Sequence, residues 1–328
     1  MGEMTSPSHT PKFLSSAREV GVTAVGFSGG QCKAGVDAAP AALIQSGLLD
    51  AIHHDLGYAV HFDGQVHSYA HLIPREDETV ANMLRSQAVS AVTQRISEQV
   101  YDHARHGRLV VNLGGDHSIA IGTISGTATA IRERLGKEMA VLWIDAHADI
   151  NTPETSDSGN IHGMPLAFLT GLACAKEEYQ VAFSWLQDKH RVPVSKLVYV
   201  GLRDVDPGER EVLRKYGIAA YSMHSIDRYG IGKVMDMALA HIGRDTPIYL
   251  SFDVDALDPS VAPSTGTPVR GGLTLREGDF ICEIVHETGQ LVGMDLVEVN
   301  PHLETHGGEE TVRVGGSLVR CALGESLL

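Results

Sequence analysis

Acidic and imidazole side chains follow two apolar runs of this sequence at a spacing of two. In "MAVLWIDAHAD" the apolar run leads into Asp145, His147 and Asp149, and in "PIYLSFDVD" it leads into Asp253 and Asp255. Side chains two apart in an extended chain point to the same side. Each set can therefore converge on one point, where the carboxylates repel one another unless a cation neutralises them.

Two further apolar runs end in residues of the same chemical types. "RLVVNLGGDHS" carries His117, and "QLVGMDLVEVNP" carries Glu298. A single acid after a strand is usually a turn former or a helix cap, and we interpret Asp116 and Asp258 in this way. Each motif alone is weak evidence, but motifs at the ends of several predicted strands favour a common site.

Six of these side chains are candidate metal ligands. Four carboxylates balance two divalent cations, and six ligands are many for one ion, so we expect a two-metal site. Oxygen-rich ligation with imidazole and without thiolate favours Mn(II) over a structural zinc ion, and two imidazoles are a poor match for Mg(II). The predicted ligands are His117, Asp145, His147, Asp149, Asp253 and Asp255.

The elements that must position these residues alternate along the chain. Apolar strands separated by helical patterns are typical of a mostly parallel, doubly wound α/β sheet with helices on both faces. In such sheets, ligands bind outside the carboxyl ends of the strands, where these motifs lie. The expected strands include 22–27, 108–118, 139–147, 196–204, 247–255 and 290–300, and the expected helices include 86–107, 119–136, 231–242, 275–287 and 311–323.

Composition narrows the class of protein. The 328 residues are 43% hydrophobic, and no apolar run approaches the roughly 20 residues that cross a bilayer. A formal net charge of -15 argues against nucleic acid and anionic membranes as partners. The scattered cysteines favour reduced thiols in a cytosolic protein. We expect a flexible tail over residues 1–18 and a single domain over residues 19–328.

Taken together, the motifs resemble those of the arginase family of manganese ureohydrolases. The resemblance rests on "GGDHS", "DAHADINTPETSDSGNIHGMP", "GLRDVDPGE", "SFDVDALDPSVAPSTGTPVRGGLTLREG" and "EVNP", which follow in this order over nearly the whole chain. It implies an arginase-like three-layer fold with one catalytic domain. It also implies that a hydroxide bridging two Mn(II) ions hydrolyses L-arginine to L-ornithine and urea. The first loop departs from the family pattern at Cys32 and Ala34.

The resemblance implies how the six ligands divide between the two ions. Asp145 and Asp253 would bridge the ions, because each belongs to both sets. The sets would be His117, Asp145, Asp149 and Asp253 for one ion, and His147, Asp145, Asp253 and Asp255 for the other.

Roles for catalytic and substrate-binding residues are implied as well. Glu298 would pair with the substrate guanidinium, Asp149 would relay a proton to the leaving amino group, and His162 would carry protons to and from solvent. Thr267 would line the pocket. The residues that would bind the amino-acid end of the substrate are Asn151, Ser156, Ser158 and Asn160 at the α-carboxylate, and Asp206 and Glu209 at the α-amino group.

Assembly and cellular role are also expectations drawn from the resemblance. Arg276 and Glu277 in "LREGD" match a region of trimer contacts, which implies a homotrimer or a dimer of trimers. The implied role is cytoplasmic arginine metabolism, including the urea cycle, with L-arginine as the partner molecule and neither nucleic acid nor membrane.

Three other functions stay open at this point. A related ureohydrolase, such as an agmatinase or a guanidino-acid hydrolase, shares the metal motifs, although the loop 151–158 and "DVDPGE" favour arginase. A non-catalytic metal-binding protein could share the fold, although all six ligands, His162 and Glu298 are present. Deacetylase chemistry on a related fold usually needs one zinc ion, whereas this chain has ligands for two metals.

Overall fold

The protein is built on one parallel β-sheet. The computed structural model describes residues 10–174, 181–303 and 307–326. Its sheet has nine strands in the order β2-β1-β4-β9-β8-β5-β6-β7, with β3 also paired to β1, and every pairing is parallel. The strands are β1 (Glu19–Val25), β2 (Ala59–His61), β3 (Val66–His67), β4 (Leu109–Leu113), β5 (Ala140–Ile144), β6 (Leu197–Leu202), β7 (Ala219–Ser222), β8 (Ile248–Asp253) and β9 (Leu291–Val297).

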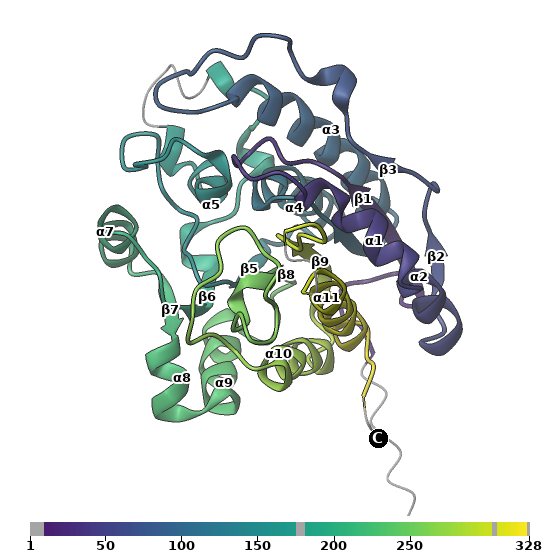
Figure 1. The fold of residues 1–328 in the computed structure, drawn as a ribbon. Helices are drawn as coiled ribbons and strands as arrows, with labels where there is room; N and C mark the ends of the chain where they lie inside the picture. Colours follow the sequence, from purple (N-terminus) through teal and green to yellow (C-terminus); the bar gives the residue numbers. More distant parts are fainter. Residues whose placement is uncertain (1–9, 175–180, 304–306, 327–328) are drawn as a thin grey trace, which may run out of the picture.

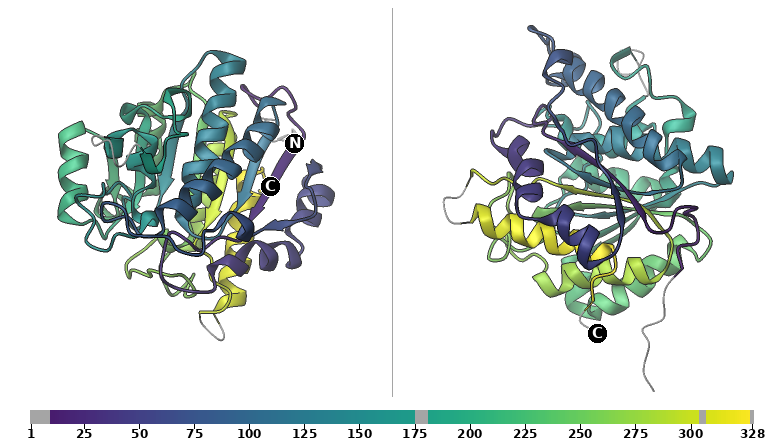
Figure 2. Two further views of the ribbon diagram at one scale, coloured as in Figure 1. Left: turned by 90° about the horizontal axis from the view of Figure 1, so that it is seen from above. Right: turned by 90° about the vertical axis from the view of Figure 1, so that its right-hand side faces the viewer.

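Helices cover both faces of this sheet (Figures 1 and 2). One face packs against α3, α4, α5 and α7, and the other packs against α1, α2, α8, α9, α10 and α11. The predicted doubly wound α/β fold in three layers is therefore confirmed. The helices are α1 (Ala39–Gln45), α2 (Leu48–Asp50), α3 (Ser86–Arg105), α4 (Ala120–Leu135), α5 (Pro165–Leu169), α7 (Pro207–Tyr216), α8 (Met223–Tyr229), α9 (Ile231–Ile242), α10 (Leu275–Glu287) and α11 (Gly308–Ala322).

The central strands supply side chains to two separate hydrophobic cores. In β5, Val141 and Trp143 pack on the face of α3 and α4, whereas Leu142 and Ile144 pack on the face of α9, α10 and α11. All residues of β4, β5, β6, β8 and β9 are buried. A strand buried on both faces favours apolar residues at nearly every position, which explains the nearly continuous apolar runs in the sequence.

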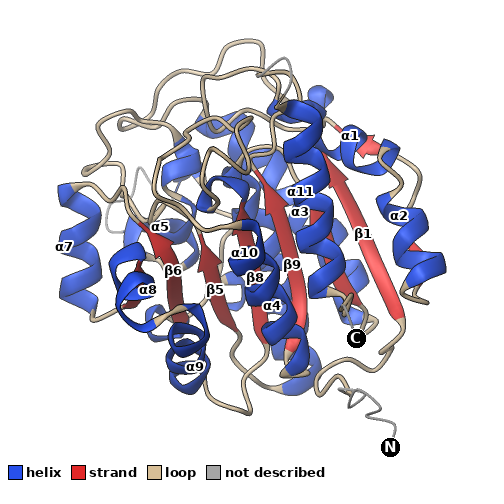
Figure 3. Ribbon diagram, turned by 60° about the horizontal axis from the view of Figure 1, so that its bottom comes forward, coloured by secondary structure: helices blue, strands red, loops and turns tan. Residues whose placement is uncertain are grey.

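Chain topology places the strands that carry the motifs side by side. The order β4-β9-β8-β5 makes these four strands neighbours, although β8 and β9 come last in the sequence. Because the strands are parallel, their carboxyl ends meet at one edge, and Figure 3 shows the long loops gathered beyond the strand arrowheads. The motifs at the four ends are therefore brought together by the sheet itself.

Most of the predicted elements coincide with observed ones, with small shifts at their ends. The first strand is Glu19–Val25 rather than 22–27, and the last helix begins at Gly308 rather than 311. The sequence pattern does not predict the short strands β2, β3 and β7 or the helices α5, α7 and α8. Runs of two to ten residues carry too few apolar positions to show a clear period.

The segment before β1 lies partly against the domain. Residues 1–9 of the tail predicted over 1–18 are outside the described residues. In the described part, Phe13 is 6% exposed, and the Lys12 backbone N–H donates to Gly289 O at 2.7 Å. Residues 1–18 as a separate flexible tail thus stay a prediction. Among the described residues, no helix combines the length and the apolar character that crossing a membrane requires.

Candidate active site

Three of the predicted ligands meet at the carboxyl ends of three strands. His117 opens a short 3-10 turn after β4, Asp145 follows β5, and Asp253 ends β8. His117 Nδ1 lies 3.2 Å from Asp145 Oδ2 and 3.2 Å from Asp253 Oδ2. One donor atom from each residue lies within 4.8 Å of the other two, so a single metal ion can contact all three.

A second group of ligands shares Asp145 with the first. His147 Nδ1 lies 3.4 Å from Asp145 Oδ1 and 3.2 Å from Asp255 Oδ2, and these donors also lie within 4.8 Å of one another. Asp149 stands beside the first group, with its Oδ2 atom 3.3 Å from His117 Nδ1. The six predicted ligands are thus brought together around Asp145, which is the residue common to both groups.

The charge of this cluster suits divalent cations. Asp145, Asp253 and Asp255 are at most 3% exposed. Burial, together with Asp255 and Asp145, raises the pKa of Asp253 well above its usual range, and burial with Asp145 raises the pKa of Asp149 to about 6. Buried acids that oppose each other's ionisation need a positive charge nearby. The oxygen and imidazole donors fit metal ions such as Mn(II), and the described ligands include no thiolate.

Residues behind His117 were missed by sequence reasoning. The Trp143 ring stacks on the His117 ring with centroids 3.9 Å apart, and Trp143 Nε1–H donates to Asp145 Oδ2 at 2.9 Å. His117 Nε2 lies 2.9 Å from Ser251 Oγ, whose hydroxyl donates to Asp295 Oδ2 at 3.1 Å. These contacts fix the orientation of the imidazole. The available signal was a polar Ser251 and an acidic Asp295 inside otherwise apolar strands.

Glu298 lies beside the ligand cluster and is held by several donors. It follows β9, is 1% exposed, and has a backbone φ of 62°, in the left-handed region. Its Oε1 atom accepts from the His117 backbone N–H at 3.0 Å and lies 3.3 Å from His162 Nδ1. Against the effect of burial, hydrogen bonding with His162 lowers the pKa of Glu298, and the same pair raises the pKa of His162 to about 9. Glu298 is therefore a buried, charged carboxylate.

Gln31 is a further site residue that the sequence did not reveal. It belongs to the Gly-rich loop after β1 and is 3% exposed. Its side-chain Nε2 atom donates to Glu298 Oε2 at 2.5 Å. A lone amide in a glycine-rich loop carries no local signal of such a contact, since its partner is 267 residues away in the sequence.

An open pocket of about 230 Å³ lies next to the cluster. In the pocket wall, Asn151 Nδ2 donates to Asp206 Oδ2 at 2.6 Å, and Thr267 Oγ1 donates to Asp255 Oδ2 at 3.0 Å. Burial and nearby acids raise the pKa of Glu209 to about 8. The lining residues are His147, Asp149, Asn151, His162, Gly163, Asp204, Asp206, Glu209, Asp253 and Thr267. Four predicted substrate-binding residues are thus brought to the cluster.

The other three predicted substrate-binding residues are not among those that line this pocket. Ser156 is buried, and its Oγ atom accepts from the Gly159 backbone N–H at 3.1 Å. Ser158 is exposed, and its Oγ atom accepts from the Asn160 backbone N–H at 3.2 Å. They lie further along the same loop, so their contact with a substrate stays a prediction.

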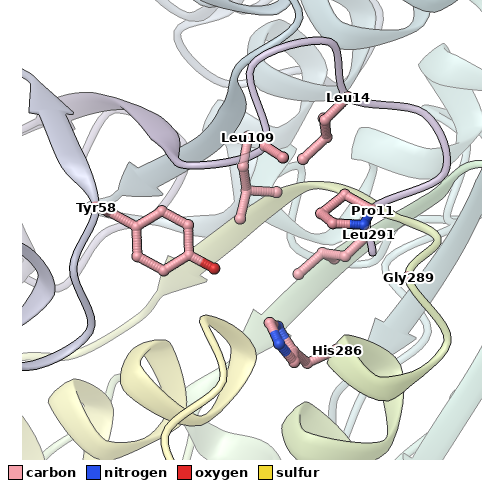
Figure 4. A pocket seen from close by; sticks show the side chains of 8 residues that line it. Pro11, Leu14, Tyr58, Leu109, His286, Gly289 and Leu291 are labelled. Carbon is pink, nitrogen blue, oxygen red and sulfur yellow. The ribbon is translucent and has the colours of Figure 1, made fainter. Parts of the chain in front are cut away.

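A second, smaller pocket of about 20 Å³ is shown in Figure 4. Leu109 and Leu291, the first residues of β4 and β9, line it, so it lies at the strand edge opposite the ligands. Tyr58 and His286 also line it, and the Tyr58 hydroxyl donates to Leu323 O at 3.0 Å. Among the described residues, none of the predicted site residues lines this pocket.

Comparison with known proteins points to one family, in the sequence and in the fold. The family model described as "Arginase family" matches residues 18–324. The arginase of Neurospora crassa is 68% identical over 99% of this chain and 91% of its own length, and that of Emericella nidulans is 64% identical over 99% and 100%. The crystal structure of a cold-adapted arginase from Glaciozyma antarctica superposes with a TM-score of 0.76 at 44% identity, covering 97% of this chain and 99% of that chain. This chain therefore belongs to the arginase family and is a hydrolase.

Proposed function

We propose that the protein hydrolyses L-arginine to L-ornithine and urea at a site that holds two Mn(II) ions. The observation that carries the proposal is the convergence of buried carboxylates and imidazoles at neighbouring strand ends, next to the charged Glu298. The fungal relatives of high identity, which are named arginases, support the choice of substrate.

The metal ions would be held by the residues that the strand ends supply. When bound, divalent ions lower the pKa of coordinated water and so provide a nucleophile near neutral pH. The shared Asp145 supports two adjacent ions, because its two oxygens face different histidines. We assign His117, Asp145, Asp149 and Asp253 to one ion, and His147, Asp145, Asp253 and Asp255 to the other.

Three residues would carry the remaining chemistry. Glu298 accepts N–H bonds from the substrate guanidinium and so directs its central carbon toward the ligand cluster. Asp149, which lines the pocket at the edge of the cluster, passes a proton to the leaving amino group. The His162 side chain is 20% exposed between Glu298 and the pocket, so it exchanges protons with solvent.

The amino-acid end of the substrate would be bound at the pocket wall farther from the metals. Acidic Asp206 and Glu209 suit the α-ammonium group, and Thr267 lines the pocket between this end and Asp255. Neutral donors suit the α-carboxylate, because unpaired polar groups would reject a decarboxylated analogue. We assign the α-carboxylate to Asn151, Ser156, Ser158 and Asn160.

Urea release from L-arginine and from agmatine tests this proposal directly. The manganese-loaded protein should release urea rapidly from L-arginine and slowly from agmatine, which lacks the α-carboxylate. Preferential release from agmatine would overturn the assignment of the amino-acid end. Release from neither substrate would overturn the proposed reaction.

We also propose a cytoplasmic homotrimer or dimer of trimers. Arg276 is exposed and pairs with Glu283 of its own helix at 2.6 Å, while Glu277 accepts from the Thr274 backbone N–H at 2.9 Å. An interface through Arg276 would exchange its partner Glu283 for a carboxylate of the next chain, at little cost because the Arg276 side chain is 66% exposed. Sedimentation equilibrium should give the mass of three or six chains, and a monomer would contradict the proposal.

A further inference from the structure

The Gly-rich loop between β1 and the first 3-10 turn reaches across the active site. The Gly30 backbone N–H donates to Asp116 Oδ2 at 2.7 Å, and the His162 backbone N–H donates to Gly30 O at 3.1 Å. Arg85 Nη2 donates to the backbone carbonyl of Gln31. Contacts from three different segments therefore fix the backbone from which the Gln31 side chain projects.

The Gln31 amide is confined against Glu298. A carboxylate only accepts hydrogen bonds, so the amide presents its NH2 group to Glu298 Oε2, at 2.5 Å. On the other side, a Cβ atom at Gly266 would lie 3.0 Å from Gln31 Oε1 and 3.4 Å from Glu298 Oε2. A side chain at position 266 would therefore press on the amide and the carboxylate, so glycine at this position leaves them their space.

Glu298 needs such support because its backbone conformation is unfavourable. A φ of 62° is uncommon for a residue with a side chain, and it persists only where the surroundings hold it. The His117 backbone N–H holds Oε1, and Gln31 holds Oε2. Without the Gln31 amide, Oε2 would lose its donor, while Oε1 would keep the His117 backbone N–H. The carboxylate could then rotate about Oε1.

We propose that Gln31 is a positioning residue, which orients Glu298 for the guanidinium group of the substrate. This inference rests on the proposed function, because it takes Glu298 as the guanidinium acceptor. A carboxylate has about four acceptor sites, and the His117 and Gln31 donors take one on each oxygen. One site on each oxygen is left for two guanidinium N–H groups, since the His162 contact at 3.3 Å is the longest and the one displaced.

The neutrality of the amide is part of the argument. A lysine or arginine at this position would also donate to Glu298, but its charge would neutralise the carboxylate and compete with the guanidinium. Glutamine fixes the direction of the carboxylate and leaves its charge available. Glutamate at position 31 would instead place a second carboxylate against Glu298.

The test compares Gln31→Met, which keeps the size and removes the donor, with Gln31→Glu. Gln31→Met should lower kcat/KM for L-arginine by about 10- to 100-fold, as expected for a hydrogen bond to a charged group. It should also weaken agmatine binding by the same factor, because agmatine shares only the guanidinium end. Gln31→Glu should lower both by more than about 100-fold through like-charge repulsion.

Two further variants separate positioning from structural damage. Asn151→Ala should weaken L-arginine binding and spare agmatine, the reverse of a guanidinium-end defect. Gln94→Met, at an exposed position of α3, should match the unaltered protein. Manganese content and the Tm should be unchanged in Gln31→Met, since the Gln31 side-chain amide donates to Glu298, which is not one of the proposed metal ligands.

The outcomes for Gln31 and for the proposed function are distinguishable. If Gln31→Met binds agmatine as well as the unaltered protein does, the positioning role is wrong, whatever the activity. If Gln31→Met loses manganese or Tm, its role is structural and the inference is also overturned. If the unaltered protein releases no urea, the proposed reaction fails, while calorimetric binding of agmatine still decides the role of Gln31.

Discussion

The two ends of the active site are held in place in different ways. At the metal end, Asp145 and Asp253 come from β5 and β8, strands that are fully buried and paired to each other over their length. At the end proposed to bind the amino-acid part of the substrate, residues 151–160 form a loop outside the sheet. The position of the first end follows from the sheet, whereas the second depends on a few bonds between loops.

The segment just before α3 makes several of these bonds. Asn82 Nδ2 donates to Pro153 O at 3.1 Å and to Ser156 O at 2.7 Å. The Leu84 backbone N–H donates to Gly159 O at 2.9 Å. Bonds to the backbone at three positions of the loop set its path over the pocket, so this segment braces the 151–160 loop.

The bracing segment is itself strained. Ala81, Asn82 and Arg85 have positive φ values of 49°, 69° and 53°. Each such residue costs about 1–3 kcal/mol and persists where its surroundings fix it. The comparison teaches that the proposed metal ligands are placed by the sheet as a whole, whereas the loop proposed to bind the amino-acid end is placed by local bonds and can change separately.

The largest difference between the metal end and the amino-acid end is expected when a proposed metal-binding side chain is removed. Asp253→Asn keeps the side-chain size but removes a buried carboxylate, which we assign to both metal ions. Metal affinity should fall by more than the roughly 10- to 100-fold typical of supporting residues, and urea release should fall with it. Metal analysis after dialysis measures the first effect. Asp245→Asn, at a position 85% exposed, is the control that should retain both, and full metal retention by Asp253→Asn would exclude this residue as a ligand.

His162 allows the chemistry to be separated from metal binding. His162→Ala should retain manganese but turn over about 100- to 10,000-fold more slowly, as expected when a proton-transfer group is lost. Added imidazole should restore part of the rate, because it can occupy the space and carry the proton. Steady-state rates with and without imidazole measure this, and no restoration at any concentration would argue against a role in proton transfer.

The smallest effect is expected at Asn82, in the segment that braces the 151–160 loop. Asn82→Gly removes the two amide hydrogen bonds while suiting the positive φ. The KM for L-arginine should rise about 5- to 10-fold, as expected for one or two hydrogen bonds, with manganese content and kcat unchanged. Ala81→Gly, which frees the backbone and removes no side-chain bond, is the matched control. If Asn82→Gly lost metal as Asp253→Asn does, the two ends would not be independent.

The metal end could be predicted from sequence because its signals are local. Alternating acids and an imidazole directly after an apolar run identify Asp145, His147 and Asp149 at a strand end, and the parallel topology brings such ends together. The same pattern predicts the central strands. The short strands β2 and β3 carry too few residues for a period to be visible.

The supporting residues could not be predicted, for a physical reason. Gln31 meets Glu298 across 267 residues, and Asn82 meets Ser156 across 74. Glutamine and asparagine in loops are most often turn or surface residues, so their types carry no signal of a partner. Such contacts are set by the packing of loops over the sheet, which only the three-dimensional structure reveals.

The strand order also has a consequence for how the protein acquires its activity. β4 and β5 carry His117 and Asp145, yet β8 and β9, from the last third of the chain, stand between them. During synthesis, the sheet cannot be completed until residues 248–297 have been made. Pairings between strands so far apart in the sequence form slowly. The proposed metal-binding groups are complete only when this insertion has occurred, so a chain cut before β8 would lack Asp253 and Asp255, two of the six proposed ligands. Metal uptake at the proposed site would therefore report that β8 has taken its place between β5 and β9.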